Sequence, residues 1–335
     1  MTAALTTPAA SAAGRPARAP RQWRWLARLH RPALICGGVL VLLTAAALVW
    51  LGGPLTDGSA AAWKAYDACG FTPVCSYDQS AILLYKDVYN WTTFAVLAVP
   101  FLVAAWAGGA LVGRETESGT ARLAWTQGVS PARWLASRLV LPAVLTAAGT
   151  GLLAGLHHWA WATGRERIDN TKFWYDAATF HANGIVPMAL ALAGLAAGAL
   201  AGLLLRRAMA ALAAAAVTVG VLWAGVHAAL PYLWPSVTRV SSLREGPLGR
   251  GLQVGEGVLT AGGGRATAPC HTSQLYGCRD TLADMGATAF YRDLHPASHY
   301  WPLQLVASGI VLAVACLLTY AAFRVLRHST GTARG

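Results

Sequence analysis

The chain alternates between long apolar blocks and shorter polar segments. Each apolar block is about 19 to 24 residues long and almost free of charged side chains. At about 1.5 Å of rise per residue, a helix of this length crosses a hydrocarbon core of about 30 Å. There are six such blocks, at residues 33–51, 91–112, 137–157, 182–205, 208–230 and 302–323. The pattern predicts an all-α, polytopic membrane protein with six transmembrane helices.

The polar segments divide the chain further. Residues 1–20 are rich in Ala, Thr and Pro, carry too little apolar surface for a core, and are predicted to be a disordered tail. In residues 21–31, arginines fall on one helical face and apolar residues on another. This indicates either an interfacial amphipathic helix or an ordinary positive flank of the first span. Residues 32–330 are predicted to form one transmembrane domain.

Positive charge is distributed unequally over the predicted loops. If the N-terminus lies inside the cell, the inside parts hold 15 of the 26 lysines and arginines but only two of the 14 acids, Glu115 and Glu117. Cytoplasmic loops carry an excess of Lys and Arg, so both ends of the chain are predicted to be cytoplasmic. The extracytoplasmic loops are then 52–90, 158–181 and 231–301, the last a large loop between helices five and six.

The composition agrees with a membrane protein. Apolar residues make up 56% of the chain and charged residues 12%, whereas a soluble domain has about 25% charged residues. The net charge of +12 is scattered between apolar blocks and forms no basic domain. We therefore expect membrane lipid, and no nucleic acid, as the partner of the basic residues.

Four of the six cysteines fall as two close pairs. Cys69 and Cys75 lie in one predicted extracytoplasmic loop, and Cys270 and Cys278 lie in another. Disulfides persist in oxidising compartments, so these four cysteines are predicted to be disulfide-bonded. Pairing within each loop and pairing between the loops are both open, because four cysteines allow three connectivities.

Motifs for catalysis and nucleotide binding are absent from the sequence. A P-loop ends in Lys followed by Ser or Thr, but the three lysines, Lys64, Lys86 and Lys172, precede Ala, Asp and Phe. There is also no HExxH pattern and no GxSxG pattern. We therefore expect no enzymatic activity and no cofactor on this chain.

The histidines form two close pairs that raise the question of a metal site. His157 and His158 are adjacent at the end of the third block, and His295 and His299 are four residues apart around Pro296. A metal site needs further ligands in fixed geometry, so we expect interfacial polar residues and no metal. The cores of the spans lack Asp, Glu, Lys and Arg, which argues against an ion-coupled carrier.

Small residues recur at helical spacing in two spans. Gly194, Gly198 and Gly202 are spaced four apart in the fourth block, and Gly151 and Gly155 repeat this spacing in the third. Such stripes allow helices to approach closely in lipid. The close packing could lie within one subunit or at a dimer interface.

The segment 113–136 is the most informative predicted inside loop. Gly119 and Thr120 break the helix that follows span two, and Ser130 and Pro131 form an N-cap and first residue for the next helix. Leu123 adds an apolar side chain between them. The result is a short helix, a turn and a second helix, which indicates either a docking surface for a soluble partner or a solvated loop.

This segment resembles the first cytoplasmic loop of type-two ABC (ATP-binding cassette) exporter permeases. The resemblance lies in the motif E-x-E-x-G-T, a Leu-containing stretch and V-S-x-x-R-W. The stretch HPASHYWPLQ before the last span is similar to small actinobacterial members. The motif positions here are Glu115, Glu117, Gly119, Thr120, Leu123, Val129, Ser130, Arg133 and Trp134. In that family the loop carries the coupling helix, which contacts the ATPase subunit.

The resemblance implies a function and its partners. The chain would be the permease of an exporter in the bacterial inner membrane and would move a hydrophobic or amphipathic substrate outward. A second permease copy and a separate ATPase subunit, which holds ATP and Mg, would complete the transporter. Charge reversal at Glu115 and Glu117 would then uncouple ATP hydrolysis from transport without unfolding the protein. The alternative is a membrane-anchored sensor or assembly protein that binds a ligand through loop 231–301.

Overall fold

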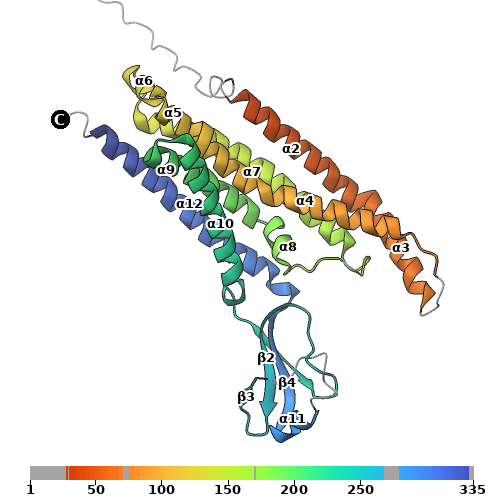
Figure 1. Cartoon of the computed structure of the whole chain (residues 1–335). Coiled ribbons are helices and arrows are strands. Elements are labelled where there is room, and N and C mark those ends of the chain that lie inside the picture. The colour runs from red at the N-terminus through yellow and green to blue at the C-terminus, as the bar shows by residue number, and fades with distance from the viewer. Residues whose placement is uncertain (1–27, 29, 71–74, 170, 268–278, 332–335) are drawn as a thin grey trace, which may run out of the picture.

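The structure is a computed structural model (Figure 1). It describes residues 28, 30–70, 75–169, 171–267 and 279–331. The predicted tail 1–20, nearly all of the predicted interfacial helix 21–31, and the pair Cys270 and Cys278 lie outside these residues.

Six helical segments are long and apolar enough to cross a membrane, one at each of the six predicted blocks. We number them spans one to six: Arg31–Cys69, Gln79–Glu117, Pro131–Gly164, Val186–Leu205, Ala208–Tyr232 and Ala297–Ser329. Their helices are α2 (Arg31–Trp50), η1 (Leu51–Leu55) and α3 (Thr56–Cys69); α4 (Gln79–Trp106), η2 (Ala107–Gly113) and α5 (Arg114–Glu117); α7 (Pro131–Gly164); α9 (Val186–Leu205); α10 (Ala208–Ala229) and η3 (Leu230–Tyr232); and η5 (Ala297–His299) and α12 (Tyr300–Gly331). The short helices α6 (Thr120–Thr126) and α8 (Ala177–Ala182) lie between spans.

The helices extend beyond the apolar blocks, most clearly in the predicted loop 52–90. Most of that segment is α3 and the start of α4. The backbone leaves helical geometry at Gly53 (φ −107°, ψ −107°), next to Pro54, where α2 passes into α3. A helix that leaves the hydrocarbon can carry polar residues, so a search for apolar blocks detects only its membrane part.

Span four, α9, is the most buried of the six. In its most apolar 18-residue window 67% of the residues are buried, against 17% in span one. A Cβ on Gly198 would lie 2.6 Å from the Gly108 amide nitrogen, and one on Gly202 would lie 2.8 Å from the Gly113 amide nitrogen. The glycine stripe of α9 therefore packs against span two of the same chain. Of the two alternatives, packing within one subunit and a dimer interface, the structure shows the first for these glycines.

The helical bundle has two distinct ends (Figure 1). We call one the α6 end, because it carries α5 and α6, and the other the sheet end. α2 begins and α12 ends near α6: His30 and Leu123 line one cavity, and Leu326 belongs to the same hydrophobic cluster as Ala121 of α6. The first and last described helices thus have their outer termini on the same side of the bundle.

A β-sheet at the sheet end corrects the all-α prediction. Strands β1 (Val237–Ser242), β2 (Leu252–Thr260), β3 (Arg265–Ala266) and β4 (Ala287–His295) form an antiparallel sheet in the order β1-β4-β2-β3. Val258 and Phe290 pack with Leu282 of helix α11 (Arg279–Asp284) in a small core. These strands are short and half-exposed, so loop 231–301 shows no apolar block although it folds.

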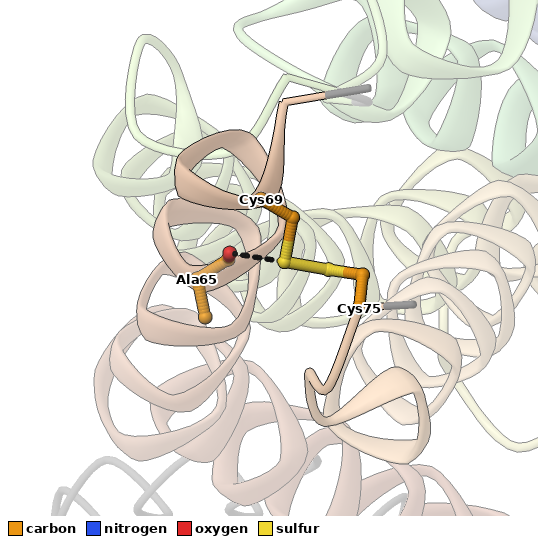
Figure 2. Close-up of a disulfide and its surroundings, with 3 residues drawn as sticks. All are labelled: Ala65, Cys69 and Cys75. Atoms are coloured by element: carbon orange, nitrogen blue, oxygen red, sulfur yellow. Dashed lines mark hydrogen bonds between the residues drawn. A yellow bond between two sulfur atoms is a disulfide. The ribbon is translucent and has the colours of Figure 1, made fainter. Parts of the chain in front are cut away.

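A disulfide joins Cys69, at the end of α3, to Cys75, shortly before α4 (Figure 2). Their Cα atoms lie 5.7 Å apart, and the Cys69 Sγ lies 3.2 Å from the Ala65 carbonyl oxygen. Disulfide formation by these two cysteines is confirmed, and of the two open pairings it is the one within a single loop.

Candidate functional site

Segment 113–136 folds as two short helices, α5 and α6, followed by the start of α7. Gly119 takes a left-handed conformation (φ 75°), which a residue without a Cβ adopts at little cost. The Thr120 hydroxyl donates a 3.2 Å hydrogen bond to the Glu115 carbonyl oxygen across this turn. At the next boundary the Ser130 side chain accepts from the Arg133 amide, and Pro131 is the first helical residue. The predicted break and the predicted N-cap are both confirmed.

Glu115 makes a buried ion pair with Arg138 of α7. The Arg138 Nη2 lies 2.8 Å from Glu115 Oε1, and its Nε lies 3.1 Å from the same oxygen. The Trp134 indole N–H donates a 3.0 Å hydrogen bond to Glu115 Oε2. Glu115 is 9% exposed and Arg138 4%. Both carboxylate oxygens are therefore engaged, and the pair fastens α5 to α7.

This arrangement corrects the expectation for Glu115 and Trp134. The sequence interpretation placed Glu115 and Glu117 on a surface that contacts a partner. In the structure Glu115 is buried, and so is Trp134, which is 2% exposed. Breaking a buried ion pair costs about 3–5 kcal/mol because one charge is left uncompensated. Charge reversal at Glu115 would place two cations together, so we now expect this variant to lose stability as well as coupling.

Aromatic packing joins α6 to the same buried pair. The Trp125 ring of α6 lies edge-on to the Trp134 ring, with centroids 5.8 Å apart. The Arg138 guanidinium lies 5.8 Å from the Trp134 ring centroid. Ala121, on the inner face of α6, is 2% exposed and belongs to a hydrophobic cluster with Leu135 of span three. α6 is thus held on the bundle and is no solvated loop.

The outer face of segment 113–136 carries the remaining predicted site residues. The Leu123 side chain is 59% exposed although it is apolar. Arg133 and Glu117 are also exposed. The Glu117 carboxylate accepts a 2.9 Å hydrogen bond from the Ala208 amide at the start of α10, so it also caps span five.

A cavity of about 890 Å³ lies behind this surface. One wall is His30 with the start of span one that follows it, and another is the end of span two, including Trp106 and Arg114. Segment 113–136 and the start of α7 close the remaining sides, with Leu123 and Trp134 among the lining residues.

A second buried polar cluster lies toward the sheet end. His157 of α7 is fully buried: its Nε2 lies 2.8 Å from the Thr93 Oγ1 of α4, and its Nδ1 lies 2.5 Å from the Asn183 Oδ1 that follows α8. The Tyr89 hydroxyl lies 2.9 Å from the Thr179 hydroxyl of α8. The sequence interpretation treated His157 as an interfacial polar residue; the structure shows its side chain hydrogen-bonded inside the bundle. Its two hydrogen-bond partners, Thr93 and Asn183, come from distant segments, so no spacing pointed to them.

Gln304 of α12 holds the other side of α8. Its side-chain amide donates a 2.8 Å hydrogen bond to the Phe180 carbonyl oxygen, and its Oε1 accepts from the amides of Ile185 and Val186. Phe180 is itself fully buried among the spans. α8 therefore plugs the bundle toward the sheet end, fixed to spans two, three and six by neutral hydrogen bonds.

The second histidine pair is an ordinary contact. The Nδ1 atoms of His295 and His299 lie 3.1 Å apart, and the His295 Nε2 lies 3.1 Å from the Pro231 carbonyl oxygen. Among the described residues, no group of three or more His, Cys, Asp and Glu side chains converges in a way that could hold a metal ion.

Comparison with known proteins gives one match. A family model described as ABC-2 membrane transporter related matches residues 38–231. The matched range covers most of span one, all of spans two to four and nearly all of span five, and it includes segment 113–136. No curated protein and no solved structure matches the chain.

Proposed function

Because the chain belongs to the ABC-2 membrane transporter related family, whose members are permease components, we propose that it is the membrane-spanning subunit of an ABC exporter. A separate nucleotide-binding subunit binds ATP and Mg and docks at the α6 end. This end faces the cytoplasm of a bacterial cell, as the distribution of lysine and arginine predicts. A second copy, or a related permease, completes the membrane part.

The observation that carries the proposal is the exposed surface formed by Leu123 and Arg133. Leu123 of α6 is an apolar side chain that is 59% exposed, and Arg133 at the start of α7 is an exposed cation; both belong to a segment that a buried ion pair holds on the bundle. Interfaces commonly combine an apolar anchor with Arg. The anchor here rests on a rigid support, so a push from a docked partner reaches the spans.

Three connections carry such a push into the membrane. The Glu115–Arg138 pair leads into span three, the Glu117 cap leads into span five, and the apolar cluster around Ala121 includes Leu326 of span six. In the proposed cycle, ATP-driven approach of the two ATPase subunits moves these elements together, a two-state change biased by a nucleotide bound elsewhere.

The substrate and direction are the least specified part of the proposal. The span cores lack acidic and basic side chains, which suits a hydrophobic or amphipathic substrate. The α8 plug then marks the exit, and release outward requires it to move away from spans two, three and six.

Copurification with the cognate ATPase tests the proposal. Leu123→Asp and Arg133→Glu should each reduce the amount of ATPase retained on the purified permease about tenfold or more, as expected for interface anchors. Both side chains are exposed, so the variants should elute as folded protein. Arg324→Glu, an exposed cation on α12 at the same end, is the matched control and should retain the ATPase.

Transport in proteoliposomes then separates the alternatives. The two surface variants should lose ATP-dependent export while Arg324→Glu keeps it. Full export by Leu123→Asp would contradict the docking site. If no ATPase binds the wild-type chain, and a ligand binds the sheet at residues 237–295 instead, the results favour the alternative hypothesis, a membrane-anchored sensor or assembly protein.

A further inference from the structure

The cavity at the α6 end has the features of a lipid site. We propose that it binds an anionic phospholipid, with the phosphate at Arg114, His30 and Trp106 and the upper acyl chain along the apolar walls. Its volume of about 890 Å³ falls in the range of about 300–1,000 Å³ typical of ligand sites. The orientation proposed above serves only to assign the lipid to the cytoplasmic leaflet.

Span one makes the cavity accessible from the bilayer. Within α2 the buried residues are Thr44 and Leu48, both in its second half. The first half presents exposed apolar side chains such as Ile35 and Val39. The start of span one therefore stands away from the bundle, and the cavity lies between it and the end of span two.

Two buried polar atoms in the wall have no partner among the described residues. They are the His30 Nε2 and the Trp106 Nε1. The two rings stand edge-to-face with centroids 5.6 Å apart, and both residues line the cavity. His30 as a whole is 8% exposed. An indole N–H can only donate, so Trp106 calls for a ligand oxygen.

The charge of the wall selects an anion. Arg114 lines the cavity and its side chain is exposed. Glu115 is the one acidic residue in the described lining, and both of its oxygens already accept from Arg138 and Trp134. No carboxylate is left to hold the ammonium of a zwitterionic headgroup, whereas a phosphate meets a cation and an indole donor. Basic pockets between spans on the cytoplasmic side bind anionic headgroups.

Burial keeps His30 suited to this role. Burial first, and then the nearby Arg138, lower the pKa of His30, against a smaller opposing effect of Glu115. A neutral imidazole has one N–H and one acceptor nitrogen, and the tautomer with its proton on Nε2 donates to the phosphate. Beside the polar lining residues Ser118, Thr120, Gln127 and Ser137, the wall has an apolar part that includes Pro32, Ala33 and Ala110 and suits a hydrocarbon chain.

A titration of the purified permease in detergent with fluorescent phosphatidylglycerol tests the site. We expect saturable binding, much weaker binding of the matching phosphatidylcholine, and little competition by inorganic phosphate, which lacks the acyl chain. Arg114→Gln and Trp106→Phe should each weaken binding about tenfold, since each removes a hydrogen bond to a charged group. Trp106→Phe keeps an aromatic ring, so the lost donor is isolated from the lost volume.

Matched controls keep the test decisive. Arg122→Gln removes an exposed cation of α6 outside the cavity, and Trp91→Phe removes an exposed indole far from it; both should bind like wild type. Equal affinity for the two lipids, or unchanged affinity in both cavity variants, would overturn the proposal. Full competition by inorganic phosphate would show a free-anion site in place of a lipid site. The assay contains no ATPase, so its failure is distinct from failure of the exporter proposal.

Discussion

The two ends of the bundle each contain a buried polar cluster, but of different chemistry. At the α6 end a carboxylate and a guanidinium are fully paired, with an indole N–H as a third partner. Toward the sheet end the groups are neutral and joined by single hydrogen bonds. Breaking the buried ion pair lowers the free energy of unfolding by about 3–5 kcal/mol. A neutral hydrogen bond contributes only about 0.5–1.5 kcal/mol to it.

The difference indicates which end moves as one body and which can open. A partner docked on α6 would move the paired helices together, because separating them exposes a buried charge. At the sheet end, the side-chain amide nitrogen of Asn183 and the Nε2 of His181 are buried without a partner among the described residues. Because some buried polar groups of this cluster already lack hydrogen-bond partners, moving α8 costs the cluster fewer hydrogen bonds.

The largest effect is expected for Glu115→Ala. It leaves the Arg138 charge buried without its carboxylate, so the free energy of unfolding should fall by about 3–5 kcal/mol. Thermal unfolding of the detergent-solubilised permease, followed by size-exclusion chromatography, measures this.

The double variant Glu115→Leu with Arg138→Met is the control for this effect. Replacing a buried pair by apolar side chains of similar size is often neutral, so this variant should recover most of the lost stability. Equal destabilisation in the single and the double variant would mean that the pair does not lock the α6 end.

An intermediate effect is expected for Asn183→Ala. The His157 Nδ1 loses its partner, and a buried group left unsatisfied costs about 1–3 kcal/mol. Because α8 is then held less tightly, a cysteine placed at the buried position Ala182 should react faster with a water-soluble thiol reagent in a background without Cys36 and Cys316.

Ser80→Ala gives a comparison on the exposed N-terminal turn of α4, where the hydroxyl donates a hydrogen bond to the Asp78 carboxylate. It should leave the labelling rate at Ala182→Cys unchanged. A loss of stability in Asn183→Ala as large as that in Glu115→Ala would remove the contrast between the two ends.

The smallest effect is expected for Glu117→Gln. The side chain is exposed, and an amide oxygen can still accept from the Ala208 amide, so only the charge at the helix N-terminus is lost. That contribution is about 0.3–1 kcal/mol and is screened by salt. Thermal unfolding at low and at high salt measures this contribution, and we expect the stability difference from wild type to shrink at high salt. A loss of several kcal/mol that does not depend on salt would show a second role for Glu117.

The parts of the fold that the sequence predicted are those determined by local chemistry. Six apolar blocks define six spans because the bilayer requires a minimum apolar length. Gly119 and Ser130 marked the turn and the helix start, because φ > 0 and N-capping depend on the residue itself. The sheet was missed because half-exposed strands lack an apolar block.

The contacts that close the site could not be predicted. Arg138 looked like one more positive flank of a span, and its pairing with Glu115 depends on how α5 and α7 meet, 23 residues apart. His157, Thr93 and Asn183 come from three segments with no common spacing. Neither spacing nor composition in the sequence signals these partners.

The central position of α9 has a consequence for biosynthesis. Its glycine face is covered by span two, which is made earlier, but Gln304 and Leu326 of span six are made last. Between spans five and six lies the sheet segment, which on the proposed topology must cross the membrane before span six can insert. Chains are synthesised from the N-terminus. Until span six is inserted, the side of α9 that span six covers is therefore exposed in the bilayer. A truncation that ends after span five should therefore be an early target for membrane proteases.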